Sequence, residues 1–537
     1  MLSYRKLAMR VLGRPLHTEG IDSPRPASQR AAAFVLTAAM LITLAAPAFA
    51  GTWYIENGDI TVKAGETKGT NKVSQGANQE VEDTDTIIKN REDTASSNTV
   101  TIDAEKKDDK VEVTLKDVNI DTSSRNKAAV SVTGSGNTTI KLDGDNALKS
   151  DTYRSGIYGS GSGSLTISGG ENDSLTAQGG SGANGISSSG SLTISGGTVT
   201  ANGDDGGRGI SSSGSVTISG GSTVTANGGS GTISGGDGIW SGGGVTISGG
   251  STVTANGGNG GSLVGGDGIR SGGGLTVSDG TVTAKGGNGD SKDGYGGDGI
   301  RSGGVVTISG NTVNAAGGYG GKVGGYGICS FDRVAISGGT VEAAGGNGST
   351  GGGSGIYSSV IDLSGSLELT AKAGSPTGKA LLQNGRELNL DTIKDKLGPG
   401  AKVTTTDANG ETKQVSTPRP VEPEESSSSS DGGSAAPSAP ASPLPGLTVT
   451  DKDGQRISYT STQSGNTLTV CVGRFTASFR ISLAALRQLR AEGIETITFQ
   501  TILCSTTLSV DELLAMGGED AEAVLTHRFT DSSLTVG

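Results

Sequence analysis

Three aspartates stand at the same place in three successive repeats of this sequence. Asp237, Asp267 and Asp298 each precede the dipeptide Gly-Ile, at intervals of 30 and 31 residues. If the repeats stack as coils, these carboxylates lie about 4.8 Å apart and repel one another. A bridging hard cation would relieve the repulsion, which makes the aspartates candidate ligands for calcium. The alternative is that each aspartate is a turn residue that bonds its own backbone.

The position after the isoleucine forms a second column. In the same three repeats it holds one tryptophan and two arginines, and tyrosines occupy this position or the aspartate position in other repeats. Aromatic rings stack on sugar rings, and a guanidinium group binds a carboxylate through two hydrogen bonds. The alternative is that the arginines only pair with the aspartates. Six residues are therefore candidates for ligand binding: Trp240, Arg270, Arg301, Tyr158, Tyr326 and Tyr357.

The composition nearly excludes catalysis by histidine. Of the two histidines, His17 belongs to an N-terminal leader, and His527 stands alone near the C-terminus, where we expect it at the surface. The sequence has no Gly-x-Ser-x-Gly elbow, zinc motif or phosphate-binding loop, and its many Gly-x-Gly patterns lie within the repeats. We therefore expect a non-catalytic protein.

Short strands must position the two columns. The isoleucine of each Gly-Ile pair recurs every 24 to 31 residues, and apolar and polar residues alternate in runs such as Val-Thr-Ile-Ser. Period-two alternation broken by glycine pairs is typical of strands joined by tight turns. Three strands in each repeat predict an all-β fold, a right-handed three-sided parallel β-helix with a continuous core. We expect Ala129 to fill the isoleucine position one coil before Ile157.

The segment that leads into the aspartate corner varies in length. It grows from 7 residues at 179–185 to 14 residues at 286–299, and the longer segments belong to the repeats that carry the two columns. Insertions that gather at one edge of a solenoid commonly mark its binding face. We therefore expect the binding face at this corner.

A Thr-x-Thr pattern offers an alternative outward surface. It recurs in four successive repeats, at 198/200, 223/225, 252/254 and 281/283. Flat arrays of this kind resemble ice-binding surfaces, whereas threonine is also simply a good outward residue of strands.

The chain divides into five segments. Residues 1–50 combine a basic start, an apolar run and an Ala-x-Ala end, which predicts a secretory signal peptide and a secreted protein. We assign residues 51–94 to an N-terminal cap and 95–395 to the β-helix. Residues 396–446 are an extended segment and a linker rich in Pro, Ser and Glu. Residues 447–537 predict a small α+β module, with helices beginning after Ser482 and Ser509.

Charge and cysteine content limit the partners. The net charge of −12 becomes more negative when the basic leader is removed, which argues against nucleic acid. No other apolar run is long enough to span a membrane. The three cysteines exclude a disulfide-rich scaffold. Either Cys471 and Cys504 pair and leave Cys329 free, or all three are free thiols.

The repeat GISSSGSLTISGGTVTANG, the opening GTWYIENGDITV and the segment VEVTLKDVNIDTSSRNKAAVSV resemble a family of secreted bacterial carbohydrate-binding β-helix proteins. The resemblance covers roughly residues 50–395. It implies a fold similar to that of pectate lyases, bound calcium, and binding of acidic plant polysaccharides, polygalacturonate in particular. It assigns no binding residue to a position of this chain.

Three functions are consistent with these features. The first is a secreted, non-catalytic β-helix that binds an acidic, uronic-acid-containing polysaccharide, with calcium as a further expectation. The second is a structural or adhesive cell-surface stalk that projects the C-terminal module. The third is a polysaccharide lyase in which Arg270 or Arg301 acts as the base.

Overall fold

The computed structural model describes residues 50–418, except Asp93, and residues 446–536. The second stretch has gaps at 452–455, 458, 465, 473–475, 502–504, 519–520 and 529–530. The two stretches belong to two compact units, and each unit is considered by itself. The predicted signal peptide, apart from Ala50, and most of the predicted linker lie outside the described residues.

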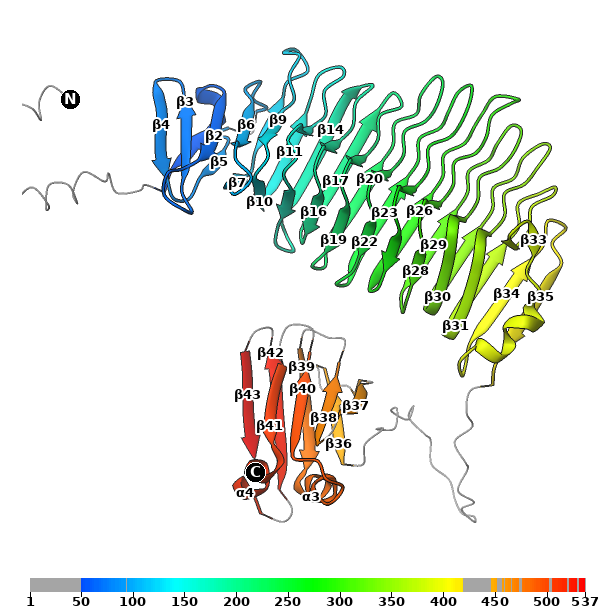
Figure 1. Ribbon diagram of the computed structural model, residues 1–537. Helices are drawn as coiled ribbons and strands as arrows, with labels where there is room; N and C mark the ends of the chain where they lie inside the picture. Colours follow the sequence, from blue (N-terminus) through cyan, green and yellow to red (C-terminus); the bar gives the residue numbers. More distant parts are fainter. Residues whose placement is uncertain are drawn as a thin grey trace, which may run out of the picture. The chain divides into compact units, whose positions relative to one another are not determined.

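Residues 50–418 form a parallel β-solenoid of about 13 turns, seen from the side in Figure 1. A regular turn contributes one strand to each of three faces, and every strand pairs in parallel with the equivalent strand of the next turn. The predicted parallel β-helix is therefore confirmed. The register follows the sequence repeat, because Ile157 pairs with Ile186 and Ile186 pairs with Ile210.

Strands of one face share one position in the repeat. The first face begins at the marker isoleucine: β6 (Val100–Ala104), β9 (Val130–Gly134), β12 (Ile157–Gly159), β15 (Ile186–Ser188), β18 (Ile210–Ser212), β21 (Ile239–Ser241), β24 (Ile269–Ser271) and β27 (Ile300–Ser302). The second face holds β7 (Lys110–Lys116), β10 (Asn137–Asp143), β13 (Leu165–Ser168), β16 (Leu192–Ser195), β19 (Val216–Ser219), β22 (Val245–Ile247), β25 (Leu275–Val277) and β28 (Val306–Ile308). The third face holds β8 (Asn119–Asp121), β11 (Asp145–Lys149), β14 (Ser174–Ser181), β17 (Thr198–Asp204), β20 (Thr223–Asn227), β23 (Ser251–Asn256), β26 (Gly280–Lys285) and β29 (Thr312–Ala316).

The two ends of the solenoid depart from this pattern. Two long strands, β30 (Ile328–Ala344) and β31 (Ile356–Lys372), each run through all three faces. Antiparallel pairs occur at both ends, between β2, β3 and β4 and between β34 and β35, and they occupy otherwise open strand edges. The end elements are β1 (Thr52–Tyr54), η1 (Ile55–Asn57), β2 (Ile60–Ala64), β3 (Asn71–Gln75), β4 (Asn78–Asp83), β5 (Ile87–Lys89), β32 (Leu381–Gln383), β33 (Arg386–Glu387), η2 (Leu390–Lys396), β34 (Lys402–Thr406) and β35 (Thr412–Ser416).

The core is the inward stripe of every strand. The marker isoleucines are fully buried. The inward valine, leucine and isoleucine residues of the second face and the inward alanines of the third face are also buried and stack from coil to coil. One expected position was wrong by one residue, because Val130 rather than Ala129 pairs with Ile157. That coil lacks a Gly-Ile pair, so spacing alone had placed the residue. Both Ala129 and Val130 are buried.

Glycine-rich arms project from the corner between the third and first faces (Figure 1). Each arm has the sequence Gly-Gly-X-Gly. The chain leaves the third face through an outgoing arm and enters the first face through a returning arm. The outgoing arms are 228–231, 257–260, 286–289, 317–320 and 345–348, and the returning arms are 235–238, 265–268, 296–299, 324–327 and 352–355. We call these ten arms together the glycine slab.

Hydrogen bonds between backbones hold the glycine slab together. Gly236 N donates to Gly229 O at 2.9 Å, Gly258 N to Gly236 O at 2.8 Å and Gly266 N to Gly258 O at 2.8 Å, and the alternation continues to Gly374. A Cβ atom on Gly236 would lie 1.9 Å from Gly207 O, and one on Gly258 would lie 2.1 Å from Gly229 O. The slab therefore requires glycine because the backbones approach closely, and the third residue of each arm is the one that carries a side chain.

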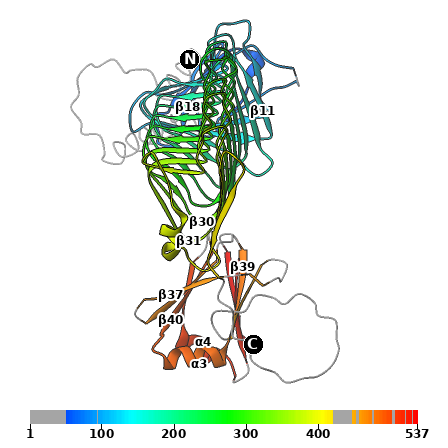
Figure 2. The ribbon, with the colours of Figure 1, turned by 90° about the vertical axis from the view of Figure 1, so that its right-hand side faces the viewer.

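The C-terminal unit contains two four-stranded sheets and two helices, in agreement with the predicted α+β module. Ser482 Oγ accepts the N–H of Ala485 at 3.2 Å, and Ser509 Oγ accepts the N–H of Glu512 at 3.4 Å, so both predicted helix starts are confirmed. Figure 2 shows the two helices together at one end of the unit. The elements are β36 (Leu447–Thr450), β37 (Thr460–Ser464), β38 (Thr467–Cys471), β39 (Thr476–Ser482), α3 (Leu483–Ala491), β40 (Thr496–Gln500), β41 (Ser505–Ser509), α4 (Val510–Met516), β42 (Glu522–Arg528) and β43 (Asp531–Val536).

The expected surface position of His527 was wrong. The side chain is fully buried, its Nε2 lies 3.0 Å from Thr506 Oγ1, and its ring packs edge-on against Phe479. Burial lowers the pKa of His527, so the ring is neutral near pH 7 and serves packing. Cys329 and Cys471 are free thiols, whereas Cys504 lies outside the described residues.

Candidate functional site

The three aspartates form a hydrogen-bonded ladder across successive coils. Each occupies the third position of a returning arm, and its Oδ1 accepts the backbone N–H of the equivalent residue in the next coil. The distances are 2.9 Å from Asp267 N to Asp237, 2.7 Å from Asp298 N to Asp267 and 2.7 Å from Tyr326 N to Asp298. The side chains are about 5% exposed, ranging from 4% to 6%. The aspartates thus bond the next coil rather than their own turn.

The second carboxylate oxygens differ along the ladder. Arg208 Nε lies 3.1 Å from Asp237 Oδ2, and Arg301 Nη1 lies 3.5 Å from Asp298 Oδ2. Asp267 forms no ion pair with any described residue. Burial, with repulsion from Asp298 and Asp237, raises the pKa of Asp267 to about 8. Burial also raises the pKa of Asp298, to about 6. The middle carboxyl therefore holds a proton at neutral pH and reduces the repulsion within the ladder.

A calcium ion requires six to eight oxygen ligands. The described residues contain no group of three or more acidic, histidine or cysteine side chains placed to hold a metal ion. In the aspartate ladder, one oxygen of each carboxylate already accepts a backbone N–H, and arginines occupy a second oxygen at both ends. The described side chains alone do not fit a calcium site, so any role of calcium here needs oxygen atoms from a ligand.

The second predicted column follows the register of the first face. Trp240 pairs with Arg270 and Arg270 pairs with Arg301, and Cys329 and Tyr357 follow in the next coils. We call Trp240, Arg270 and Arg301 the arginine column. Arg270 is exposed, and the other two side chains are half-buried. The structure therefore places all three outward on adjacent strands.

The six predicted ligand-binding residues do not all lie together. Tyr326 and Tyr357 stack with their ring centres 5.0 Å apart and lie beyond Arg301 along the axis. Tyr158 lies at the other end, separated from Trp240 by Ser187 and Ser211 in the same register. The arginine column and the two stacked tyrosines therefore form one stretch of the face, and Tyr158 belongs to another.

Two residues outside the six predicted candidates contact the arginine column. The Arg208 guanidinium lies 4.5 Å from the ring centre of Trp240, and the Arg301 guanidinium lies 5.3 Å from that of Phe331. Arg208 stands in the aspartate position one coil before Asp237. Its side chain extends to Asp237 in the next coil. Its place in the aspartate column is the feature of the sequence that could have identified it. Phe331 lies in the irregular strand β30, where the repeat pattern gives no guide.

Arg270 differs from its neighbours. Arg208 and Arg301 each combine an aspartate with an aromatic ring, whereas Arg270 makes no ion pair with any residue of the described part of the chain. Its guanidinium is exposed between Trp240 and Arg301. Arginine binds carboxylates and other planar anions through two parallel hydrogen bonds. The arrangement can hold an anion at Arg270 beside an aromatic surface.

The insertions end in exposed apolar side chains. Ile233, Leu263, Val264 and Tyr295 are 40% to 59% exposed at the outer ends of the arms, and Tyr319, the third residue of an outgoing arm, is 47% exposed. Backbone bridges such as Gly260 to Gly289 and Gly289 to Gly320 keep successive tips in register. The glycine slab therefore separates the tips from the arginine column, and the variable insertions form an edge of their own.

The Thr-x-Thr residues lie in register on the third face. Thr198, Thr223, Thr252 and Thr281 form one column, and the threonines two residues later form the next. Their outward position agrees with both interpretations of the pattern, so ice binding stays a prediction.

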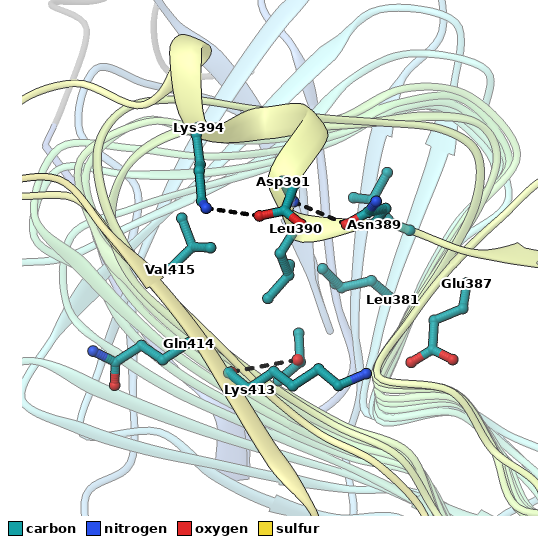
Figure 3. A pocket seen from close by; sticks show the side chains of 11 residues that line it. Leu381, Glu387, Asn389, Leu390, Asp391, Lys394, Lys413, Gln414 and Val415 are labelled. Atoms are coloured by element: carbon teal, nitrogen blue, oxygen red, sulfur yellow. Dashed lines mark hydrogen bonds and ion pairs between the residues drawn. The ribbon is translucent and has the colours of Figure 1, made fainter.

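A cavity of about 520 Å³ lies at the C-terminal end of the solenoid (Figure 3). Its apolar wall includes Leu381, Leu390 and Val415, and Lys394 and Asp391 form an ion pair of 2.7 Å at its rim. The wall residues belong to the core of the solenoid. We interpret this cavity as part of the C-terminal cap, between η2 and the antiparallel pair β34 and β35.

No helix in the described part of the chain is long and apolar enough to cross a membrane. Comparison with known proteins finds no match: no family model, no curated protein and no solved structure matches the chain.

Proposed function

We propose that the first face of this solenoid binds an acidic polysaccharide without catalysing its cleavage. The observation that carries the proposal is the exposed Arg270, which has no carboxylate partner among the described residues although the chain has a net charge of −12. In such a chain an unpaired guanidinium between an aromatic ring and a second arginine favours a ligand that brings its own anion.

The neighbouring groups support binding rather than chemistry. A base must be able to lose its proton, and arginine is ordinarily always charged. Although burial works against it, Asp298 and Asp267 raise the pKa of Arg301 above its ordinary value. Burial raises the pKa of the Cys329 thiol to about 12, so this thiol is a poor nucleophile. These groups favour a binding face over a lyase.

Affinity electrophoresis of the full chain tests the proposal. Migration through gels that contain polygalacturonate is compared with migration through gels that contain a neutral glucan, with calcium and with a chelator. We expect retardation by the acidic polymer only. Loss of retardation with the chelator would support calcium as a bridge between ligand and protein. Equal migration in all gels would refute the proposal.

An adhesive stalk is the second candidate. The exposed row of apolar tips on the glycine slab favours it, because contiguous apolar surface commonly marks a contact site. A cell-adhesion assay with the full chain and with a variant in which Leu263 and Tyr295 are replaced by serine tests this candidate. Equal adhesion of both variants would count against a role of the tips.

A further inference from the structure

A second depression lies on the first face, three coils before Trp240. It has a volume of about 360 Å³ and contains Tyr158 from β12. The other lining residues are Thr99, Thr101, Asn126, Lys127, Ala128, Ser131 and Arg154. Small and hydroxylic side chains form much of its lining, and two cations and one aromatic ring are its largest groups.

The charges around this depression are not balanced. Arg154 Nε bonds Asn126 Oδ1 at 3.2 Å, and Arg154 forms no ion pair with any described carboxylate. Lys127 and Arg125 share one carboxylate, that of Asp59, at 2.9 Å each. Burial opposes ionisation of Asp59, but hydrogen bonds from Lys127, Thr99 and Arg125 lower its pKa to about 2. The carboxylate of Asp59 thus pairs with both Lys127 and Arg125. Arg154 has no carboxylate partner among the described residues and is available to bind an anionic ligand.

A second acidic group beside the depression holds the loop. Asp151 accepts the backbone N–H of Asn126 at 2.7 Å through Oδ2 and that of Thr152 at 2.7 Å through Oδ1. It keeps its negative charge but forms no ion pair with the guanidinium of Arg154. Three cations thus stand against two carboxylates at the depression, on the surface of an acidic chain.

The loop beside the depression shows backbone strain. Tyr153, next to Arg154, has a φ of 59°, in the left-handed region that residues with a side chain seldom adopt. Its N–H donates to Ser181 O at 2.8 Å, and its ring is 78% exposed. Strained residues persist where the surrounding structure fixes them, and they cluster at binding sites. A fixed loop presents Arg154 at low entropic cost to a ligand.

The depression and the arginine column share one line along the solenoid. Tyr158 and Trp240 occupy the same register position, and Ser187 and Ser211 lie between them. Three coil steps correspond to about 14 Å. Two aromatic residues, each beside an arginine without a carboxylate partner among the described residues, therefore flank a floor of two serines, of which Ser187 is half-buried and Ser211 is buried. This spacing exceeds what a single sugar ring can bridge.

We infer that the depression at Arg154 and Tyr158 is a second anionic subsite, and that the ligand is a linear polyanionic glycan lying parallel to the solenoid axis. The chain contacts Arg154 and Tyr158 at one end, crosses Ser187 and Ser211, and contacts Trp240 and Arg270 at the other. This inference rests on the proposed function, because it extends the same face. It adds the orientation of the ligand and its minimum length.

Binding of two linked subsites predicts a strong dependence on ligand length. A galacturonate monosaccharide reaches one subsite, whereas polygalacturonate reaches both and gains affinity because the second contact becomes intramolecular. Isothermal titration with both ligands measures this difference. We expect Arg154→Ala to weaken binding of the polymer by at least about tenfold and to remove most of its advantage over the monosaccharide.

A substitution between the subsites tests the orientation. Ser187→Glu places a negative charge on the floor, next to Tyr158 but two coils from Trp240. We expect it to weaken polymer binding, while monosaccharide binding at Trp240 and Arg270 is unchanged. Arg386→Ala, an exposed arginine of β33, is the matched control, and thermal unfolding verifies that each variant is folded. If Arg270→Ala weakens polymer binding and Arg154→Ala does not, this inference is overturned and the proposed function stands. If neither substitution matters, both fall.

Discussion

Arg301 Nη1 lies 3.5 Å from Asp298 Oδ2, whereas Arg270 and Asp267, at the equivalent positions one coil earlier, form no such pair. The missing ion pair concerns the charge of Asp267 and the exposure of Arg270. Asp267 is buried among carboxyls and holds a proton, so it attracts Arg270 weakly. Arg270 is exposed and does not offset the effect of burial on this carboxyl. The proton on Asp267 and the exposed guanidinium of Arg270 thus both accompany the missing ion pair between these two side chains.

Replacing Arg270 tests the central contact of the proposed face. We expect Arg270→Ala to weaken binding of polygalacturonate by about tenfold or more, since charge-assisted hydrogen bonds contribute about 1.5–3 kcal/mol. The free energy of unfolding should change by less than about 0.5 kcal/mol, because the side chain is exposed. Affinity electrophoresis and denaturant unfolding measure the two quantities. Arg386→Ala serves as the control, and equal weakening by both substitutions would point to a general charge effect.

The protonation of Asp267 predicts a pH dependence of stability. In the unfolded chain its pKa is near the ordinary 3.8, and in the folded chain it is about 8. Between these values the folded state binds more protons, so the free energy of unfolding falls as pH rises, by up to about 1.4 kcal/mol per pH unit. Asp267→Asn cannot ionise, and its amide oxygen can still accept the N–H of Asp298.

An asparagine already occupies the equivalent position in another coil of the native chain. Asn184 stands in the same position two coils before Asp237 and accepts the N–H of Arg208 at 2.8 Å, so an amide fits the ladder. We therefore expect Asp267→Asn to be more stable than the native chain at pH 8 and to lose stability less steeply between pH 4 and pH 8. Denaturant unfolding across this range measures both. Asp279→Asn, at an exposed turn, is the control, and parallel curves for Asp267→Asn and the native chain would contradict the assigned protonation.

The sequence repeat predicted the fold and the columns because period-two alternation and coil spacing determine register directly. Asp237, Asp267 and Asp298 align as expected, and so do Trp240, Arg270 and Arg301. The partner of each side chain could not be predicted, because side-chain length and direction decide it. Arg208 forms an ion pair with Asp237 in the next coil, whereas Arg270 forms none with Asp267.

The other incorrect or missing predictions also have local causes. Val130 replaced Ala129 where the Gly-Ile marker is absent, and no repeat guided the placement of Phe331. His527 was expected at the surface because it stands alone near the C-terminus, but packing against Phe479 and a hydrogen bond to Thr506 accommodate its ring. The glycine slab was visible only as turns, since its hydrogen bonds join arms of different coils. Period and composition do not encode such contacts.

The close packing of the glycine slab predicts that even a methyl side chain is not tolerated at the glycine positions of the arms. A Cβ atom on Gly287 would lie 2.0 Å from Gly258 O, so Gly287→Ala must push two backbones apart. We expect a loss of about 1–3 kcal/mol in the free energy of unfolding. Gly351→Ala is the matched control, because its nearest neighbour would be the Thr377 side chain at an ordinary 3.5 Å. Similar unfolding curves for both variants would show that the arms are not closely packed in solution.

Trp240 provides a direct optical report on the face. The chain has two tryptophans, and the other, Trp53, is buried at the N-terminal end with its indole N–H bonded to Asp83 at 2.7 Å. Binding of polygalacturonate should therefore change the fluorescence of Trp240 alone.

We expect Trp240→Phe to abolish the fluorescence change on binding. Arg208→Ala should remove the cation over the ring and alter the emission of the free protein. It also leaves the buried Asp237 without its ion pair, so we expect it to lower the free energy of unfolding and to weaken binding because the face is less well ordered. Arg208→Lys keeps the charge but not the planar fork, and it should restore part of the affinity. A full fluorescence response in Trp240→Phe would place the ligand away from the arginine column.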